Sequence, residues 1–328
     1  MTPALVAAKK KYPTAEIWVV VRRGAENVLE GCPAIDRLIT TVPPAKFNRK
    51  TSTWGATCGL IRKLRRMKFD YIFELGDGDR GRWLSALCRA RHRCTNAHLN
   101  PLSAFWRLFF KEISTLNWLP MHRVEKDFRT VDEFLPLGDE IPNLQFDKNS
   151  ASDWPAAKDL SEFAVIHPST RWRRKRYPEE KWEIIGRYLL SKFPHLILSC
   201  GPDEEEIGDA RKLHSKLGDQ VLFTEGKLSW RQIAGILYKA KLFVGVDTAA
   251  MHLAAACKCP TVAIFGPSVP WMWHPWKTKA EVVSPENHDT YPRSLPTIEH
   301  IEELRIENVC PNAVIASCNR ILSSETTI

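Results

Sequence analysis

The stretch FVGVDTAAMHLAAACKCPTVAIFGPS, residues 243–268, limits the fold of this chain more than any other segment. The apolar run 242–246 predicts a buried strand, and Asp247 follows directly after it. Three small residues then lead into a predicted helix at 251–257, and a second strand pattern follows. A strand that enters a helix in this way points free backbone N–H groups and the positive helix dipole at a ligand. The segment therefore predicts an α/β fold with a diphosphate-binding turn. A capped structural helix without a ligand is the alternative.

Charge and composition favour anionic partners. The 328 residues carry a net charge of +9, and 44% of them are hydrophobic, which is enough for one or two α/β domains. A basic surface attracts nucleic acid, anionic lipid or a phosphorylated substrate. We expect no nucleic-acid partner, because neither a recognition helix nor an aromatic platform accompanies the charge. The missing GxGxxG motif excludes a nicotinamide dehydrogenase.

The cysteine pattern and the absence of a leader sequence bear on location. Nine scattered cysteines without a CxxC pair predict reduced thiols and no zinc set. No signal-peptide pattern opens the chain, and no apolar run approaches the ~20 residues of a membrane span. We therefore expect a cytoplasmic protein whose contact with a membrane is peripheral and largely electrostatic.

Alternating strand and helix patterns predict two doubly wound α/β domains. Among the expected elements are strands at 163–167, 221–223 and 242–246 and helices at 83–91 and 204–217. A polar, aperiodic segment at 137–159 is the linker candidate. We place a first domain at 1–150, a second at 151–300, and C-terminal helices at 301–328 that pack back on the first domain. A helix pattern at 4–11 is the first element, although a sheet of this kind normally begins with a strand.

A second constellation, VIHPSTRWRRKRYPEEKW, occupies residues 165–182. A predicted strand ends at His167, and a loop with Ser169, Thr170 and five cations follows. Hydroxyl groups and cations at the carboxyl end of a strand are typical of a phosphate site. Lys175 lies close to the start of the next helix and is the best candidate for a diphosphate contact. A solvated basic patch is the alternative.

Together these segments resemble the bacterial glycosyltransferases that add heptose to the lipopolysaccharide inner core, most closely the heptosyltransferase III type. VDTAAMHLAAA and HPSTRWRRKRYP carry the resemblance most sharply, and FGPS, WHPW and GDGDRG extend it over nearly the whole chain. It implies a GT-B fold, with two Rossmann-like domains that face a cleft, and an inverting transfer from ADP-heptose. The acceptor is then a lipopolysaccharide core linked to lipid A, reached at the inner face of the inner membrane. The resemblance implies no required cofactor and no metal ligands in the protein, and a Mg²⁺ ion carried with the diphosphate stays open.

The resemblance also implies roles for single residues. Lys175 is the expected catalytic cation at the leaving diphosphate, Leu228 packs on adenine, and an acid in the run 203–206, with Glu205 favoured, contacts the ribose. The first domain is basic, which suits an acceptor with carboxylates and phosphates, although a solvated helix face explains the same residues. The implied donor-binding residues are Ser169, Thr170, Glu205, Leu228, Asp247, Thr248, Ala249, Ala250 and His252, and the acceptor candidates are Arg49, Arg62, Arg65 and Arg66.

The start of the chain departs from this family pattern. Members carry a first strand and a Gly-Asp loop before the Thr-Pro pair, and the Asp of that loop is the expected general base. Here Met1 directly precedes Thr2, so we expect a first domain that lacks its first strand. The alternative function is a catalytically silent homologue that still binds a nucleotide sugar. Asp77 and Asp79 lie at another strand end, where a turn-forming role is equally consistent.

Overall fold

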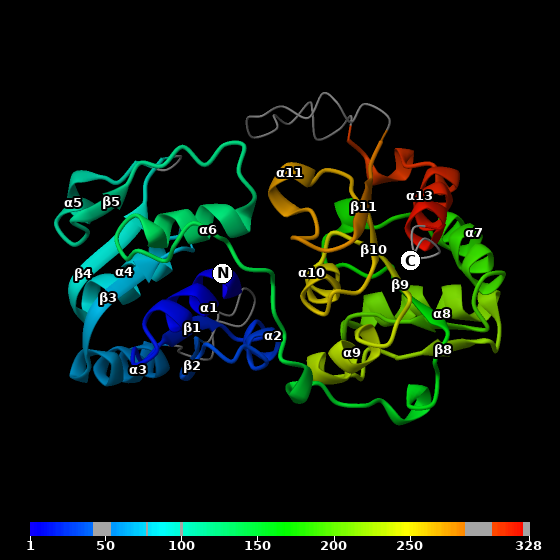
Figure 1. Cartoon of the computed structure of the whole chain (residues 1–328), viewed down its shortest axis with the longest axis horizontal. Helices are drawn as coiled ribbons and strands as arrows, with labels where there is room; N and C mark the ends of the chain where they lie inside the picture. Colours follow the sequence, from blue (N-terminus) through cyan, green and yellow to red (C-terminus); the bar gives the residue numbers. More distant parts are fainter. Residues whose placement is uncertain (42–53, 77, 99–100, 286–303, 324–328) are drawn as a thin grey trace. The chain divides into compact units, whose positions relative to one another are not determined.

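The computed structural model describes residues 1–41, 54–76, 78–98, 101–285 and 304–323, and these form two α/β units (Figure 1). The first unit comprises Met1–Pro142 and the second Asn143–Ile328. The division falls inside the predicted linker, eight residues before the predicted boundary at 150. All strand pairs in the described residues are parallel, which confirms the predicted α/β class.

The strands of the first unit lie in two sheets, β1–β2 and β3–β4–β5. Trp18 of β1 and Phe69 of β3 make an edge-to-face contact with ring centroids 5.6 Å apart, so the two sheets are neighbours. The elements of this unit are α1 (Thr2–Lys11), β1 (Trp18–Arg22), α2 (Glu26–Leu29), β2 (Arg37–Thr41), α3 (Trp54–Arg66), β3 (Lys68–Glu74), α4 (Asp79–Leu87), β4 (Arg89–Asn96), α5 (Ala104–Arg107), β5 (Glu112–Ser114) and α6 (Arg123–Asp132).

A helix expected at residues 83–91 is wrong in its second half. Helix α4 ends at Leu87 because Cys88 takes an extended conformation, with φ −83° and ψ 160°. The following segment, RARHRCTN, then forms β4 and pairs with β3 from Arg89 to Thr95. Its exposed arginines resemble a helix surface in sequence, and pairing with β3 overrides that local tendency.

The second unit is built on one six-stranded sheet with the order β11-β10-β9-β6-β7-β8. Its strands read as continuous apolar runs because helices cover both faces. Ile166 and Val244 pack with α7, α8 and α13, whereas Val165 and Phe243 pack with α9 and α10. The elements are β6 (Phe163–His167), α7 (Glu179–Leu190), β7 (His195–Leu198), α8 (Glu204–Leu217), β8 (Val221–Phe223), α9 (Trp230–Leu237), β9 (Leu242–Val246), α10 (Ala249–Ala256), β10 (Thr261–Ile264), α11 (Pro270–Trp273), β11 (Ala280–Val283) and α13 (Pro311–Ser323), with short 3-10 turns η1 (Lys148–Ser150), η2 (Pro155–Ala157), η3 (Arg173–Lys175) and η5 (Ile306–Asn308).

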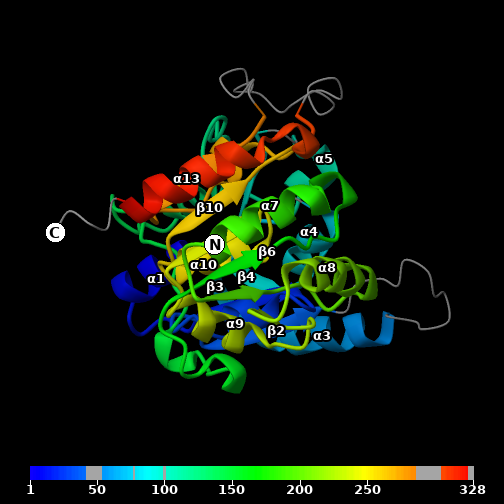
Figure 2. The same ribbon diagram turned by 90° about the vertical axis from the view of Figure 1, so that its right-hand side faces the viewer.

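The C-terminal helix belongs to the second unit. Helix α13 packs on β10, β11 and α7, and Figure 2 shows it running along β10. Its apolar stripe, Val314, Cys318 and Ile321, has helical spacing and is buried in the core of that unit. The described contacts of α13 thus lie within the second unit, and packing of the C-terminal helices on the first domain stays a prediction. The face of β10 and β11 offers this stripe an apolar surface within the second unit.

The helices of the described ranges are too short or too polar to cross a membrane. Within the same ranges none of the nine cysteines forms a disulfide, and seven of them are buried. Burial raises the pKa of the Cys257 and Cys318 thiols to about 12, so these groups stay protonated.

Candidate functional site

Two chain segments that lie far apart in the sequence meet at the carboxyl-terminal end of the sheet in the second unit. β6 and β9 are neighbours, and His167 at the end of β6 is in register with Gly245. Because parallel strands end on the same side, the loops that follow them converge there. The loop after β6 carries Lys175, and the turn after β9 begins with Asp247. The structure therefore brings together the two constellations that the sequence singled out.

An ion pair between Lys175 and Asp247 joins the two segments. Lys175 Nζ donates to Asp247 Oδ2 at 2.5 Å. The Asp247 side chain is 8% exposed and that of Lys175 is 23% exposed, so bulk water screens the pair poorly. The Lys175 ammonium also lies 5.7 Å from the ring centroid of Trp172. The contacts with Asp247 and Trp172 therefore hold the Lys175 ammonium group at the end of the sheet.

His252 approaches the same carboxylate from helix α10. Its Nε2 lies 3.9 Å from Asp247 Oδ1, and its ring meets Trp273 edge-on at a centroid distance of 6.4 Å. Burial lowers the pKa of His252 because it disfavours the imidazolium, although the Asp247 carboxylate acts in the opposite direction. We therefore expect a neutral imidazole at neutral pH, so Lys175 supplies the positive charge at Asp247.

The N-terminus of α10 is open toward this ion pair. The helix begins at Ala249, two residues earlier than predicted, and Thr248 is the N-cap without a side-chain cap hydrogen bond. The amides of Ala249, Ala250 and Met251 precede the first helical hydrogen bond, as the sequence predicted. The Asp247 carboxylate, a candidate cap, instead accepts from Lys175.

Within the described part of the chain, two buried hydroxyl groups near these strand ends have no hydrogen-bond partner. Thr248 Oγ1 follows β9, and Ser268 Oγ follows β10, the next strand of the sheet. Buried hydroxyls without a hydrogen bond are uncommon, and a ligand oxygen would satisfy them. Sequence analysis missed Ser268, although it ends the FGPS motif. Only its burial without a partner in the folded chain identifies it.

Ser169 and Thr170 use their hydroxyl groups differently. Ser169 Oγ donates to the buried Glu206 Oε2 at 2.6 Å and accepts from the Gly201 amide at 2.8 Å. Its only hydrogen is therefore engaged, and Ser169 fastens its loop to the start of α8. Thr170 Oγ1 accepts from the Trp172 amide at 3.3 Å. Within the described residues its hydroxyl hydrogen has no acceptor and is available to a ligand.

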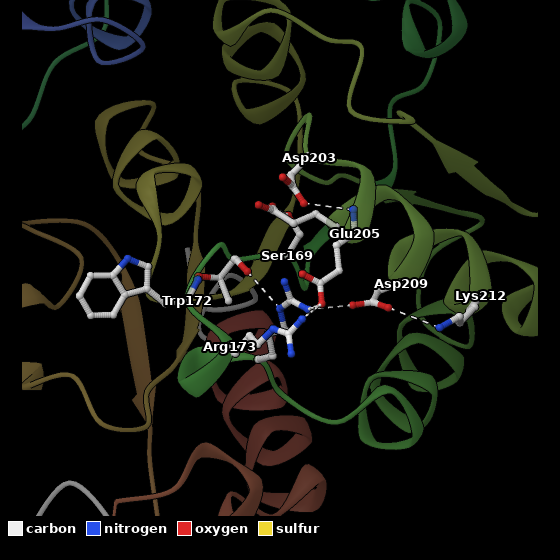
Figure 3. A network of polar contacts seen from close by, with 10 residues as sticks. Ser169, Trp172, Arg173, Asp203, Glu205, Asp209 and Lys212 are labelled. Atoms are coloured by element: carbon white, nitrogen blue, oxygen red, sulfur yellow. Dashed lines mark hydrogen bonds and ion pairs between the residues drawn. The ribbon is translucent and has the colours of Figure 1, made fainter. Parts of the chain in front are cut away.

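Glu205 lies in a charged network at the surface (Figure 3). Its Oε1 lies 2.8 Å from both Arg173 Nη2 and Arg176 Nη1. The Arg176 hydrogen bond is the main reason why the pKa of Glu205 is lowered. Arg176 also reaches Asp209 at 3.3 Å. The carboxylate of Glu205, the predicted ribose contact, therefore already pairs with two arginines.

The remaining predicted residues lie at varied positions. Leu228 is half-buried, packs on the core beside α10, and stands directly before the Ser229 cap of α9. Arg62, Arg65 and Arg66 are exposed on α3, and Arg49 lies outside the described residues. In the described part of the chain, no group of three or more His, Cys, Asp or Glu side chains could hold a metal ion.

Comparison with known proteins identifies the family. Residues 58–299 match glycosyltransferase family 9 (heptosyltransferase). The chain belongs to this family. It is 25% identical over 346 residues to lipopolysaccharide heptosyltransferase 3 of Escherichia coli, covering 99% of this chain and 96% of that protein. It is also 25% identical over 278 residues to lipopolysaccharide heptosyltransferase 1 of Pseudomonas aeruginosa, covering 82% of this chain and 75% of that protein.

Solved structures of family 9 proteins share the fold. A family 9 glycosyltransferase from Veillonella parvula superimposes with a TM-score of 0.78 at 19% identity, over 98% of this chain and 92% of that chain. The E. coli heptosyltransferase WaaC with ADP gives a TM-score of 0.77 at 20% identity, over 98% and 94%. The GT-B fold predicted from the sequence is thereby confirmed, and the family 9 chain is a glycosyltransferase.

Proposed function

We propose that this family 9 glycosyltransferase transfers heptose from ADP-heptose to the lipopolysaccharide inner core, with inversion at the anomeric carbon. The observation that carries the proposal is the Lys175–Asp247 pair beside the open N-terminus of α10. A cation and free backbone amides at the carboxyl-terminal end of a parallel sheet are suited to binding a diphosphate. The choice of heptose as the sugar is supported by a family 9 relative, since one solved structure of E. coli WaaC contains ADP-2-deoxy-2-fluoro heptose.

The chemistry follows from the charge that develops on the leaving group. When the anomeric bond breaks, negative charge moves onto the departing ADP, and groups that bind this charge lower the barrier. An ammonium group has three N–H donors. One of the Lys175 donors faces Asp247, which leaves two for phosphate oxygens. The amides of Ala249 and Ala250 and the hydroxyl of Thr248 complete the proposed diphosphate site.

Other residues hold the rest of the donor. Thr170 offers its hydroxyl to a phosphate, and Ser169 keeps the loop in place through Glu206. Glu205 binds the ribose hydroxyls after exchanging one of its arginine partners for them. Leu228 presents an apolar surface to adenine. A Mg²⁺ ion bound with the diphosphate remains a prediction, since Lys175 and the α10 amides already supply positive charge.

The acceptor binds through the basic first unit. Arg62, Arg65 and Arg66 on α3 are exposed, and with Arg49 they form the proposed contact for the phosphates and carboxylates of the core. Inversion requires the acceptor hydroxyl to attack from the face opposite ADP, with a base to take its proton. We place this reaction in the cytoplasm at the inner face of the inner membrane.

A transfer assay tests the proposal and its alternative. The protein is incubated with ADP-heptose and an inner-core acceptor, and ADP release, product mass and anomeric configuration are measured. Glycosylated product of inverted configuration supports the proposal, and Lys175→Ala should abolish most of it. ADP-heptose binding without product would favour the silent nucleotide-sugar-binding homologue. Absence of ADP-heptose binding would refute both functions.

A further inference from the structure

An aromatic patch projects from the surface of the first unit. It consists of Trp83 on α4 with Phe105 and Leu108 at α5, whose exposed fractions are 45%, 46% and 75%. These are three of the six large hydrophobic residues that are exposed in the described residues. Single exposed apolar residues are ordinary, but a contiguous group marks an interaction surface.

The patch is held in place from below. Trp83 lies 5.6 Å from Phe105 and 5.0 Å from Trp106 between ring centroids. Trp106 and Phe110 are buried beneath α5. Leu108 follows Phe105 by three residues, and its amide donates to the Phe105 carbonyl at 3.2 Å, so both side chains lie on the same face. The exposed side chains are therefore ordered before any partner arrives.

The chain segments that carry these side chains have an excess of basic residues. Residues 101–111 contain Arg107 and Lys111 and no acidic residue, and residues 79–93 contain five arginines against one aspartate. Arg107 and Lys111 are exposed, and neither makes an ion pair within the described residues. The partner of this surface must therefore accept large apolar side chains and also carry negative charge.

We propose that the aromatic patch docks the first unit onto the surface of an anionic lipid bilayer. Trp, Phe and Leu side chains enter the boundary between head groups and acyl chains, while neighbouring Arg and Lys side chains bind the anionic head groups. A second copy of the chain is a less suitable partner, because a two-fold symmetric contact would bring the basic residues of the two copies against each other. This docking rests on the proposed function, which places the reaction at the inner face of the inner membrane. It needs no nucleotide, so vesicle binding can be tested separately from transfer.

Vesicle sedimentation tests the proposal. The full chain is mixed with vesicles of phosphatidylcholine, with and without about 40% phosphatidylglycerol, and the bound fraction is measured at low and high salt. We expect binding to the anionic vesicles that weakens as salt rises. The triple change Trp83→Ser, Phe105→Ser and Leu108→Ser should lower the partition coefficient at least about tenfold, because it removes most of the inserted apolar area.

Two controls make the result specific. Ile184→Ser changes an equally exposed side chain, 45% exposed, on α7 of the second unit, and vesicle binding should stay unchanged. ADP binding and the melting temperature of the triple variant report that it is folded. Equal partition of wild type and triple variant would overturn the proposal. It would also fail if the triple change converted a dimer to a monomer in sedimentation velocity without altering vesicle binding.

Discussion

Replacing Lys175 with alanine should remove both stability and ADP affinity. The change leaves the Asp247 carboxylate, 8% exposed, without its cation, and the neighbouring His252 is held neutral by burial. Loss of one partner of a buried pair costs up to ~3–5 kcal/mol. Because the Lys175 side chain keeps 23% exposure, water replaces part of the interaction, and we expect ~2–3 kcal/mol.

These magnitudes translate into a measurable melting shift. The second unit, Asn143–Ile328, contains 186 residues. For a unit of this size each kcal/mol shifts the Tm by ~2–4 °C, so we expect a decrease of roughly 4–12 °C in calorimetry. Loss of a charged contact to the diphosphate should also raise the Kd for ADP by ~10–100-fold.

Arg173→Ala is the matched control for this change. Arg173 lies in the same turn, but its side chain is 79% exposed, and an exposed pair contributes only ~0–1 kcal/mol. Lys175→Ala with Asp247→Asn should regain most of the lost stability, since no uncompensated charge is left, without regaining ADP affinity. Equal ADP affinities of the Lys175→Ala and Arg173→Ala variants would refute the assignment of Lys175 as the diphosphate cation.

Three further outcomes are expected. Burial lowers the pKa of His167 from 6.5 to about 4, so between these pH values only the unfolded chain binds a proton at this imidazole. The free energy of unfolding should therefore be highest above pH ~6.5 and should fall by up to about 3 kcal/mol as the pH approaches 4. His167→Asn should flatten the profile of Tm against pH, and parallel profiles of variant and wild type would contradict this. Gly235→Ala should lower the Tm because the new Cβ would lie 2.2 Å from the Ser152 carbonyl oxygen. Gly208→Ala, whose Cβ would have no atom within 4 Å, should instead raise stability by ~0.5–1 kcal/mol. Similar melting curves of the two variants would show that the backbone at Ser152 shifts to accept the methyl group. Ser268→Ala should leave the Tm unchanged or higher, since it removes an unpaired buried hydroxyl, yet weaken ADP binding several-fold in calorimetry; unchanged affinity would place Ser268 outside the donor site.

The second unit was the more predictable half of the fold. Runs such as FAVIH and LFVGV are apolar on both faces, and the predicted bounds of β6, β8, β9 and α8 agree with the structure. The first unit offered weaker signals because its strands carry charges on the exposed side, as in RARHRCTN. Local propensity there favours a helix, and only pairing with β3 determines a strand.

The site was predictable as two halves, but not as a pair. The sequence indicates that Lys175 and Asp247 each follow a strand, whereas the contact between them depends on β6 and β9 being neighbours. The acidic run at the start of α8 shows a second limit. Successive helical residues point about 100° apart, so Glu205 reaches the arginines while Glu206 turns inward to Ser169. Tertiary packing, which the run itself does not encode, determines which acid faces the site.

The divided sheet of the first unit has a consequence for how that unit opens. β1 and β2 form a ribbon of two strands, and such a ribbon is only marginally stable without further packing. In the described residues of the second unit, helices cover both faces of the six-stranded sheet. Amide hydrogens of Trp18–Arg22 should therefore exchange with solvent long before those of Leu242–Val246. Limited proteolysis should accordingly cut the first unit first and leave the second as a resistant fragment.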